Sequence, residues 1–546
     1  MSATTASPAA PAAHTQRPNR APGTEIHPPM GDGGTWVLQR GPRYIRVSPD
    51  VAALAGHFDG RRDHGELARL MGGTWNAEMV GFAVRRLDDL QLIDNGEMRA
   101  PRREGRFKMV PPFTFQFTLL RPGRTMQSLQ PLFARLGNRY LVGTALLIAL
   151  TGLLALAVQS AYVTTSLSGP LSPLTYLGIL AGLVIGTSIH ELGHAATLIR
   201  YGGKPSRIGI MLFYLMPAFF CDVSDAWRLP QRRQRVHVAL AGPAVQTFLA
   251  GAAALAAWPM ADSGAKTALV FFALGSYITG LLNLLPFIKL DGYIALMSHV
   301  DVPYLRDRAI TDARRLIARL LFGGTYEREL KHRWTTAYGL ACMVFPLYLL
   351  STALQLWIDL LRRGGVIGIC LAACGVSYGL YFLGRGVRRL AAEVRASGAR
   401  RPRIALVSTA VAAAAGALMF LPVPHTVSAA YVSRPGGGVD LVLLDGADTD
   451  RIAPGQKVTL TTNGPVLNPT TGTATVGDAP AGTGEAPLDS FFPLDLGGAL
   501  TMPVTRYRLD PDGAPDEPTG AARVDTGRLP LWEVGYRTYI SPFLPS

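Results

Sequence analysis

Long apolar segments alternate with short basic ones through the middle of the chain. A membrane-spanning helix needs about 20 mostly apolar residues, and the chain has seven segments of this kind. They are Tyr140–Val163, Leu174–Ile199, Val236–Trp258, Thr267–Ile288, Thr335–Ile358, Val366–Leu383 and Ile404–Leu421. The pattern predicts an α-helical polytopic membrane protein with about seven transmembrane helices, which together form a domain at 140–424.

The region before these spans has the pattern of a small folded domain. Between residues 36 and 94 the strand-like stretch "YIRV" is followed by three capped segments with helical periodicity. This order predicts a winged-helix-like domain at 31–100. The Ala-, Pro- and Thr-rich residues 1–30 have no apolar core and predict a disordered arm, and residues 101–139 are expected to be a cytoplasmic linker.

Two further segments stand out by their apolar pattern. After His425, short β-type runs are separated by Gly, Pro, Asn and Asp, which predicts an all-β domain at 425–546. The apolar stretch at 208–220 is too short to cross a bilayer and contains a proline, so we expect a re-entrant or interfacial piece. Asp222 and Asp225 follow it and are expected to cap or solvate a turn.

Composition supports the membrane assignment. Hydrophobic residues make up 48% of the chain and charged residues 17%, whereas soluble proteins carry about 25% charged residues. The arginine clusters lie beside apolar spans and are not interleaved with aromatic residues, so no nucleic-acid partner is expected and the expected surroundings are a lipid bilayer.

Charge also predicts the orientation. The formal net charge is +15, yet residues 425–546 hold 14 acidic and 8 basic residues. Basic clusters precede the first, third and seventh spans and follow the fourth, and such clusters collect on the cytoplasmic side. We therefore expect a multi-pass protein of the cell membrane with a cytoplasmic N-terminus and an extracytoplasmic C-terminal domain. Arg362 and Arg363 fall on the wrong side in this orientation.

Ionisable residues interrupt the second span. "GTSIHELGHAATL" places His190, Glu191 and His194 inside apolar sequence. At helical pitch the two histidines share one face, and two imidazoles at this spacing can hold one Zn²⁺ with the glutamate beside them as general base. Ionisable groups inside a span default to function, although an isolated HExxH pattern also occurs by accident in soluble helices.

A catalytic zinc needs a third protein ligand and an open position. Asp291 is the candidate, because it directly follows the apolar run of the fourth span in "NLLPFIKLDGY". The second and fourth spans run in the same direction, so His190, His194 and Asp291 are expected at the same depth. An Asp at a membrane boundary often has no function beyond ending the apolar span in contact with water. His237 and His299 are expected to be ordinary interface residues.

"HELGH" in one span and "NLLPFIKLDG" two spans later resemble the site-2 protease family of intramembrane zinc metalloproteases. The resemblance implies His190, His194 and Asp291 as zinc ligands, Glu191 as catalytic base, and a catalytic role for Asn283 in holding the substrate or the developing oxyanion. Many members have Asn-Pro where this chain has Asn283-Leu284, which leaves the role of Asn283 open.

The flanks carry a second resemblance. Residues 36–94 are similar to PqqD-like leader-recognition domains of ribosomally synthesised, modified-peptide (RiPP) pathways, and "PAFFCDVSDAWRLPQRRQR" resembles the peptide zinc metalloprotease branch found with daptide-type pathways. These resemblances imply a zinc endopeptidase that hydrolyses a bond of a membrane-associated peptide and removes the leader of a precursor peptide.

Two alternatives remain at this point. One is a regulatory site-2 protease that cleaves a membrane-bound anti-sigma factor. Such enzymes usually carry a PDZ-type insertion, and only residues 200–235 separate the second and third spans here, which is short for a domain. The other is a non-catalytic peptide export or immunity component.

Overall fold

The computed structural model describes most of the chain. The described residues are 13–29, 36–41, 43–96, 105–110, 114–121, 128, 130–136, 139–213, 216–323, 325, 327–363, 365–434, 438–444, 451–478, 482–513 and 515–539. All structural statements below refer to these residues.

Six helices of the described part are long and apolar enough to cross a membrane. They are α6 (Arg139–Val158), α8 (Pro173–Arg200), α9 (Arg232–Ala257), α10 (Gly264–Leu284), α13 (Trp334–Arg363) and α15 (Arg401–Met419). The remaining expected span, Val366–Leu383, lies in α14 (Gly365–Ala396), and part of its side chains fall outside the description. The protein is thus mostly helical with six apolar spans, and a seventh stays a prediction.

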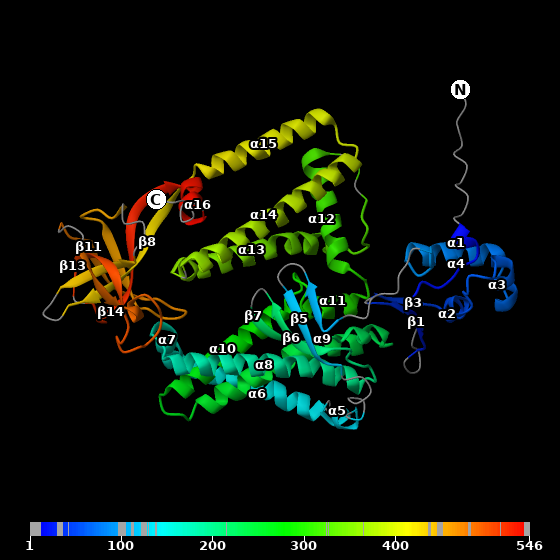
Figure 1. Cartoon of the computed structure of the whole chain (residues 1–546), viewed down its shortest axis with the longest axis horizontal. Helices are drawn as coiled ribbons and strands as arrows, with labels where there is room; N and C mark the ends of the chain where they lie inside the picture. Colours follow the sequence, from blue (N-terminus) through cyan, green and yellow to red (C-terminus); the bar gives the residue numbers. More distant parts are fainter. Residues whose placement is uncertain are drawn as a thin grey trace.

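Helices α6, α8, α9 and α10 form one packed group, and α12 (Leu305–Phe322) connects it to α13, α14 and α15 (Figure 1). Small residues let the first group pack closely, as is common between membrane helices. A Cβ on Gly152 of α6 would lie 2.3 Å from the Cα of Gly251 on α9. Neither glycine can therefore be replaced without separating the two helices.

The segment at 208–220 forms a β-hairpin, and its expected re-entrant or interfacial location stays a prediction. It consists of β6 (Ile208–Phe213) and β7 (Met216–Cys221). The preceding strands β4 (Phe107–Val110) and β5 (Thr114–Leu120) extend it to an antiparallel sheet of order β4-β5-β6-β7. Residues 101–139, expected only to link domains, thus supply half of this sheet and α5 (Gln130–Leu136).

The N-terminal domain has a three-stranded antiparallel sheet of order β1-β2-β3, covered by three helices. Its elements are β1 (Thr24–His27), β2 (Trp36–Arg40), β3 (Arg43–Val47), α2 (Pro49–Gly56), α3 (His64–Met71) and α4 (Ala77–Asp89). Their caps explain the boundaries: Ser48, Asp63 and Asn76 each accept a hydrogen bond from a backbone amide of the helix that follows.

The expected disordered arm at 1–30 is corrected from residue 13 onward. Residues 13–16 form the short helix α1, β1 pairs with β2, and Ala21 is buried. Residues 1–12 lie outside the described part. The domain therefore begins before residue 31, because its sheet is incomplete without β1.

The C-terminal domain is a six-stranded β-barrel, which confirms the predicted all-β domain. Its strands follow the order β11-β10-β14-β8-β9-β13, and pairing of β11 with β13 closes the ring while β12 adds to β13. The strands are β8 (Pro422–Ser433), β9 (Val439–Leu444), β10 (Lys457–Thr461), β11 (Thr470–Val476), β12 (Gly482–Pro487), β13 (Thr501–Pro511) and β14 (Thr519–Pro530). Helix α16 (Leu531–Tyr539) follows.

The two flanking domains lie at opposite ends of the helical group (Figure 1). The barrel rests on the turn between α7 (Ser160–Ser168) and α8, where Leu171 and Leu494 form a β-bridge and the Tyr176 hydroxyl donates to the Pro493 carbonyl at 2.8 Å. The N-terminal domain contacts the other end of the group through Arg46 and Asp301, whose side chains lie 3.0 Å apart.

This arrangement makes a prediction about topology. A reporter fused after Ser546 is expected to report an extracytoplasmic location, and one fused before Met1 a cytoplasmic location, because the barrel and the N-terminal domain lie at opposite ends of the helical group. Alkaline phosphatase activity and fluorescence of a green fluorescent protein fusion measure the two sides. If both termini report the same side, the odd span count is wrong, and the region around Arg362 is the place to re-examine.

Candidate metal centre

Helix α8 carries His190 and His194 one turn apart, and both side chains are buried. The His194 Nδ1–H donates to the Val238 carbonyl of α9 at 2.7 Å. This bond fixes the ring orientation and leaves Nε2 with a free lone pair, which is how metal-binding histidines are commonly held. The two Nε2 atoms lie 3.2 Å apart.

Asp291 reaches the same point from another helix. Helix α10 ends at Leu284, and after a turn α11 (Asp291–Val300) begins with Asp291 itself. A Cβ on Gly292 would lie only 2.1 Å from the Leu284 carbonyl oxygen. The glycine therefore lets the start of α11 fold tightly against the end of α10, which turns the carboxylate toward α8.

The three side chains form a compact donor set. Asp291 Oδ2 lies 3.2 Å from His190 Nε2, and Asp291 Oδ1 lies 3.4 Å from His194 Nε2. In a tetrahedral site with bonds of about 2.0–2.1 Å, the ligand atoms are about 3.3–3.4 Å apart. The observed spacing fits a small tetrahedral ion, so this group can hold a metal.

Gly242 of α9 lies directly against this donor set. A Cβ at this position would lie 2.3 Å from His194 Nε2 and 2.5 Å from His190 Nε2. Only a residue without a side chain lets α9 approach the two nitrogen atoms that face Asp291 this closely. A larger residue would push the two rings away from Asp291. The donor set and the glycine beside it therefore both fit the zinc ion that the resemblance implies.

Glu191 lies next to the donor set and is held by the sheet. Its Oε2 accepts a hydrogen bond of 2.8 Å from the Cys221 backbone N–H, at the end of β7. The hairpin thus fixes the carboxylate through the backbone. One oxygen of the carboxylate is engaged in this way, and no hydrogen bond of the other oxygen is found among the described residues.

The other sequence-predicted residues lie around the group. Asn283 is half-buried near the end of α10, and no hydrogen bond of its side chain is found among the described residues. His237 is exposed and bonds to the Tyr201 hydroxyl at 2.7 Å, and His299 is exposed on α11. Neither histidine belongs to the group of His190, His194 and Asp291.

Asp222 and Asp225 shape the loop that follows β7. Asp222 accepts hydrogen bonds from Ser206 and Ser224, and Asp225 accepts one from the Lys204 backbone N–H. Burial raises the pKa of Asp222, but these hydrogen bonds and Arg207 outweigh it and hold that pKa below its usual value. The two carboxylates fix a turn, and so they hold the end of β7 beside Glu191.

Comparison with known proteins gave no further identification. No protein-family model matches the chain, and the searches of curated proteins and of solved structures gave no significant match.

Proposed function

We propose that this protein is a membrane-embedded zinc endopeptidase of the site-2 protease type. The observation that carries the proposal is the convergence of His190, His194 and Asp291 from two helices, with Glu191 held beside them. Buried ionisable groups inside an apolar span are costly, and a complete set of three ligands and one base is the arrangement of a catalytic zinc site.

The chain's own groups account for the proton transfers. When bound, a zinc ion supplies Lewis acidity to the scissile carbonyl and to the attacking water. Glu191 takes a proton from the water and passes it to the leaving amine. The hydrogen bond from the Cys221 N–H keeps the carboxylate in one orientation during this exchange. Asn283 is proposed to hold the substrate or the developing oxyanion.

A substrate helix has to unwind locally before its backbone is accessible, and β7 supports this step. In the order β4-β5-β6-β7, β7 is the terminal strand, and its last residue donates to Glu191. An extended peptide that pairs with a sheet edge satisfies its own backbone groups there. We propose that the substrate lies along β7, which brings its peptide bond to the base.

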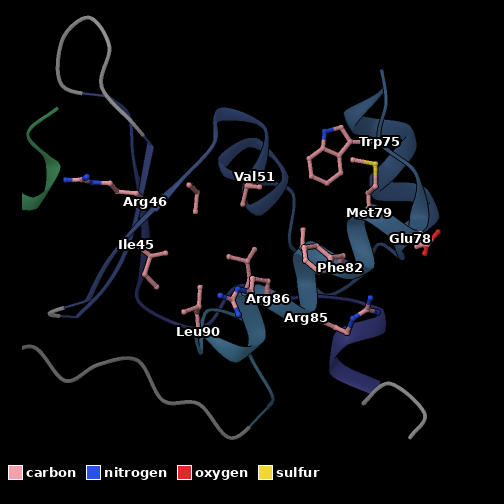
Figure 2. A pocket seen from close by; sticks show the side chains of 13 residues that line it. Ile45, Arg46, Val51, Trp75, Glu78, Met79, Phe82, Arg85, Arg86 and Leu90 are labelled. Atoms are coloured by element: carbon pink, nitrogen blue, oxygen red, sulfur yellow. The ribbon is translucent and has the colours of Figure 1, made fainter. Parts of the chain in front are cut away.

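The N-terminal domain supports a peptide as the substrate. A groove of about 700 Å³ runs between β3 and α4, and Figure 2 shows that Trp75, Met79 and Phe82 line one side while Ile45 lines the other. Phe82 is 67% exposed. β3 is the terminal strand of its sheet, so an extended leader peptide can pair with β3 and place apolar side chains in the groove.

We therefore propose leader removal from a ribosomally synthesised precursor, as in daptide-type pathways, as the reaction. A regulatory protease acting on an anti-sigma factor remains the second candidate. It is less favoured because residues 200–235 are used by the β6–β7 hairpin and its loop, which leaves no room for an inserted domain. A non-catalytic export component would have no use for Glu191 beside a complete ligand set.

The test is cleavage of the precursor by the full chain in detergent. Wild-type protein is expected to cleave the precursor. Phe82→Ser is expected to raise KM about tenfold with little change in kcat. The reason is that a Phe82 ring covered by the bound peptide contributes about 1–2 kcal/mol to binding. Zinc content is measured in the same samples and should not change.

Leu70→Ser is the matched control. Leu70 is 53% exposed on α3 of the same domain but lies outside the groove. Equal KM values for Phe82→Ser and wild type would remove the groove from substrate binding. Absence of cleavage by wild-type protein that contains zinc would instead shift the assignment to another substrate.

A further inference from the structure

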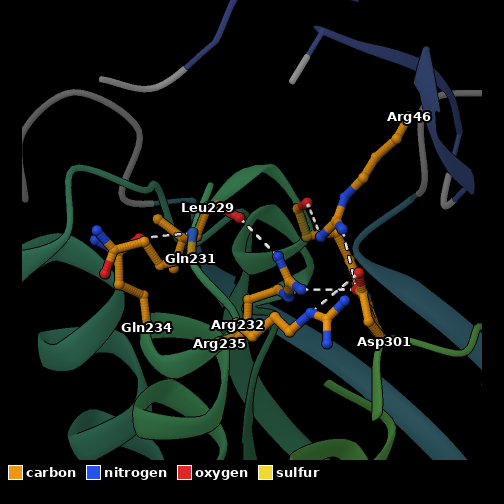
Figure 3. Close-up of polar contacts among 8 residues, drawn as sticks. Arg46, Leu229, Gln231, Arg232, Gln234, Arg235 and Asp301 are labelled. Carbon is orange, nitrogen blue, oxygen red and sulfur yellow. Dashed lines mark hydrogen bonds and ion pairs between the residues drawn. The ribbon is translucent and has the colours of Figure 1, made fainter. Parts of the chain in front are cut away.

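Three arginines surround a single carboxylate where the N-terminal domain meets the membrane domain (Figure 3). Asp301, which directly follows α11, accepts from Arg46 Nη1 at 3.0 Å and from Arg235 Nη2 at 2.8 Å. Arg232 Nε lies 3.4 Å from the other carboxylate oxygen. We call Arg46, Arg232, Arg235 and Asp301 the arginine cluster.

The charges of the arginine cluster do not balance. Three guanidinium groups face one carboxylate, and like charges at such distances repel each other. Arg235 makes this costly, because its side chain is only 2% exposed. Its Nε is buried without a hydrogen-bond partner among the described residues. Arg46 and Arg232 remain 32% and 61% exposed, so a second anion can reach the cluster from solvent.

The arginine cluster adjoins the groove of the N-terminal domain. Arg46 belongs to both, since it lines the groove and also donates to Asp301. In Figure 2 the Arg46 side chain points away from the other residues that line the groove, toward the membrane domain. Side chains alternate between the two faces along a strand. A peptide that pairs with β3 therefore presents every second side chain to the groove and the others to the face where the guanidinium groups lie.

We propose that the arginine cluster is a binding site for an acidic side chain of the peptide that occupies the groove. This inference rests on the proposed leader-binding role of the groove and adds the chemistry that the site selects. A Glu or Asp carboxylate supplies the second negative charge, and bidentate guanidinium–carboxylate bonds are directional. Because Arg232, Arg235 and Asp301 come from the membrane domain, such a peptide contacts both domains at once.

The arginine cluster also differs from a simple contact that holds two domains together. A contact of that kind needs only Arg46 and Asp301, and further arginines weaken it by repulsion. For an anion site the opposite holds, since each guanidinium adds attraction for the ligand. The two interpretations therefore predict different effects when Asp301 loses its charge.

The experiment measures binding of two fluorescent probe peptides to the full chain in detergent. Both have twelve residues with alternating Leu and Ser. In each pair of peptides one residue is replaced, by Glu in one peptide and by Gln in the other. A series of such pairs moves the replacement through all positions. For wild-type protein we expect the best Glu peptide to bind about tenfold more tightly than its Gln partner, the effect of one good charged hydrogen-bonded contact.

Matched variants locate this preference. Arg232→Gln should reduce the ratio of the two Kd values to about twofold, as the contact loses one of its partners. Arg233→Gln is the control, because Arg233 is exposed on the same helix and lies outside the arginine cluster. Asp301→Asn should increase the ratio, since the competing carboxylate is gone. Asn also tolerates the left-handed backbone at this position (φ 59°). Zinc content and the melting temperature report whether each variant is folded.

The outcomes separate this inference from the proposed function. A ratio that falls equally in Arg233→Gln and Arg232→Gln, or that falls in Asp301→Asn, overturns the anion site. Equal binding of Glu and Gln peptides at all positions also overturns it but leaves the groove in place. If neither peptide binds, both the anion site and the leader-binding role fail, whereas the peptidase is still judged by zinc content and cleavage.

Discussion

Glu191→Gln is expected to retain the metal and to lose precursor cleavage by about 10²–10⁴-fold, the usual contribution of a positioned general base. Glutamine has nearly the same shape, and its Oε1 can still accept the hydrogen bond from the Cys221 N–H. The ligand set of His190, His194 and Asp291 is not touched. Only the ability to take a proton from water is removed, so zinc content and activity should separate.

Zinc is measured by elemental analysis and cleavage by mass spectrometry on the same preparation. Glu329→Gln serves as the matched control, because Glu329 pairs with Arg308 on the protein surface, away from the metal centre. Cleavage at a near-normal rate in Glu191→Gln would refute the proposed proton transfer. Loss of zinc together with activity would show that Glu191 acts on the metal site rather than as the base.

The helical part of the fold could be predicted because each span carries its own signal. An apolar run of sufficient length predicts a spanning helix without knowledge of its neighbours, and six of the predicted spans coincide with helices in the structure. The barrel domain could be predicted for a similar reason, from short β-type runs between turn residues. Its closure through β11 and β13 could not, because pairing between distant strands leaves no local pattern.

The sheet β4-β5-β6-β7 shows why the strands of the apolar segment at 208–220 could not be predicted from the sequence. Its apolar residues satisfied the pattern of a membrane segment, while its strand partners lie about a hundred residues earlier in the chain. The alternation of apolar and polar residues in "TFQFTLL" at 114–120 indicates a strand, but it does not indicate which other strand pairs with it. Register pairs such as Phe117 with Ile210 appear only in the structure.

Some residues of the candidate site could likewise be predicted from the sequence, and others could not. His190, Glu191 and His194 could be chosen because their residue types carry chemistry that apolar spans otherwise exclude, and Asp291 because it directly follows the apolar run of the fourth span. Gly242 and the Cys221 backbone could not, since a glycine in an apolar helix and a main-chain N–H look ordinary in a sequence. Their roles depend on which helix or strand lies opposite, and this is set by packing.

Gly242→Ala is expected to lower the zinc content from about one ion per chain to the background level of Asp291→Ala, which lacks a ligand. The new methyl group would lie 2.3 Å from His194 Nε2 and 2.5 Å from His190 Nε2, closer than van der Waals contact permits. The two imidazole rings must rotate away from the methyl group. The His194 ring is, however, held by a hydrogen bond to the Val238 carbonyl, which lies on α9 like Gly242. The two nitrogen atoms can then no longer share one ion with Asp291.

Helix stability cannot explain such a loss, because alanine stabilises a helix interior by about 0.5–1 kcal/mol relative to glycine. Gly143→Ala is the control: Gly143 lies in α6, and a Cβ there meets nothing within 4 Å. This variant should keep its zinc and its activity. Full zinc occupancy in Gly242→Ala, measured by elemental analysis beside both reference variants, would mean that the ion does not sit between the Nε2 atoms and Asp291.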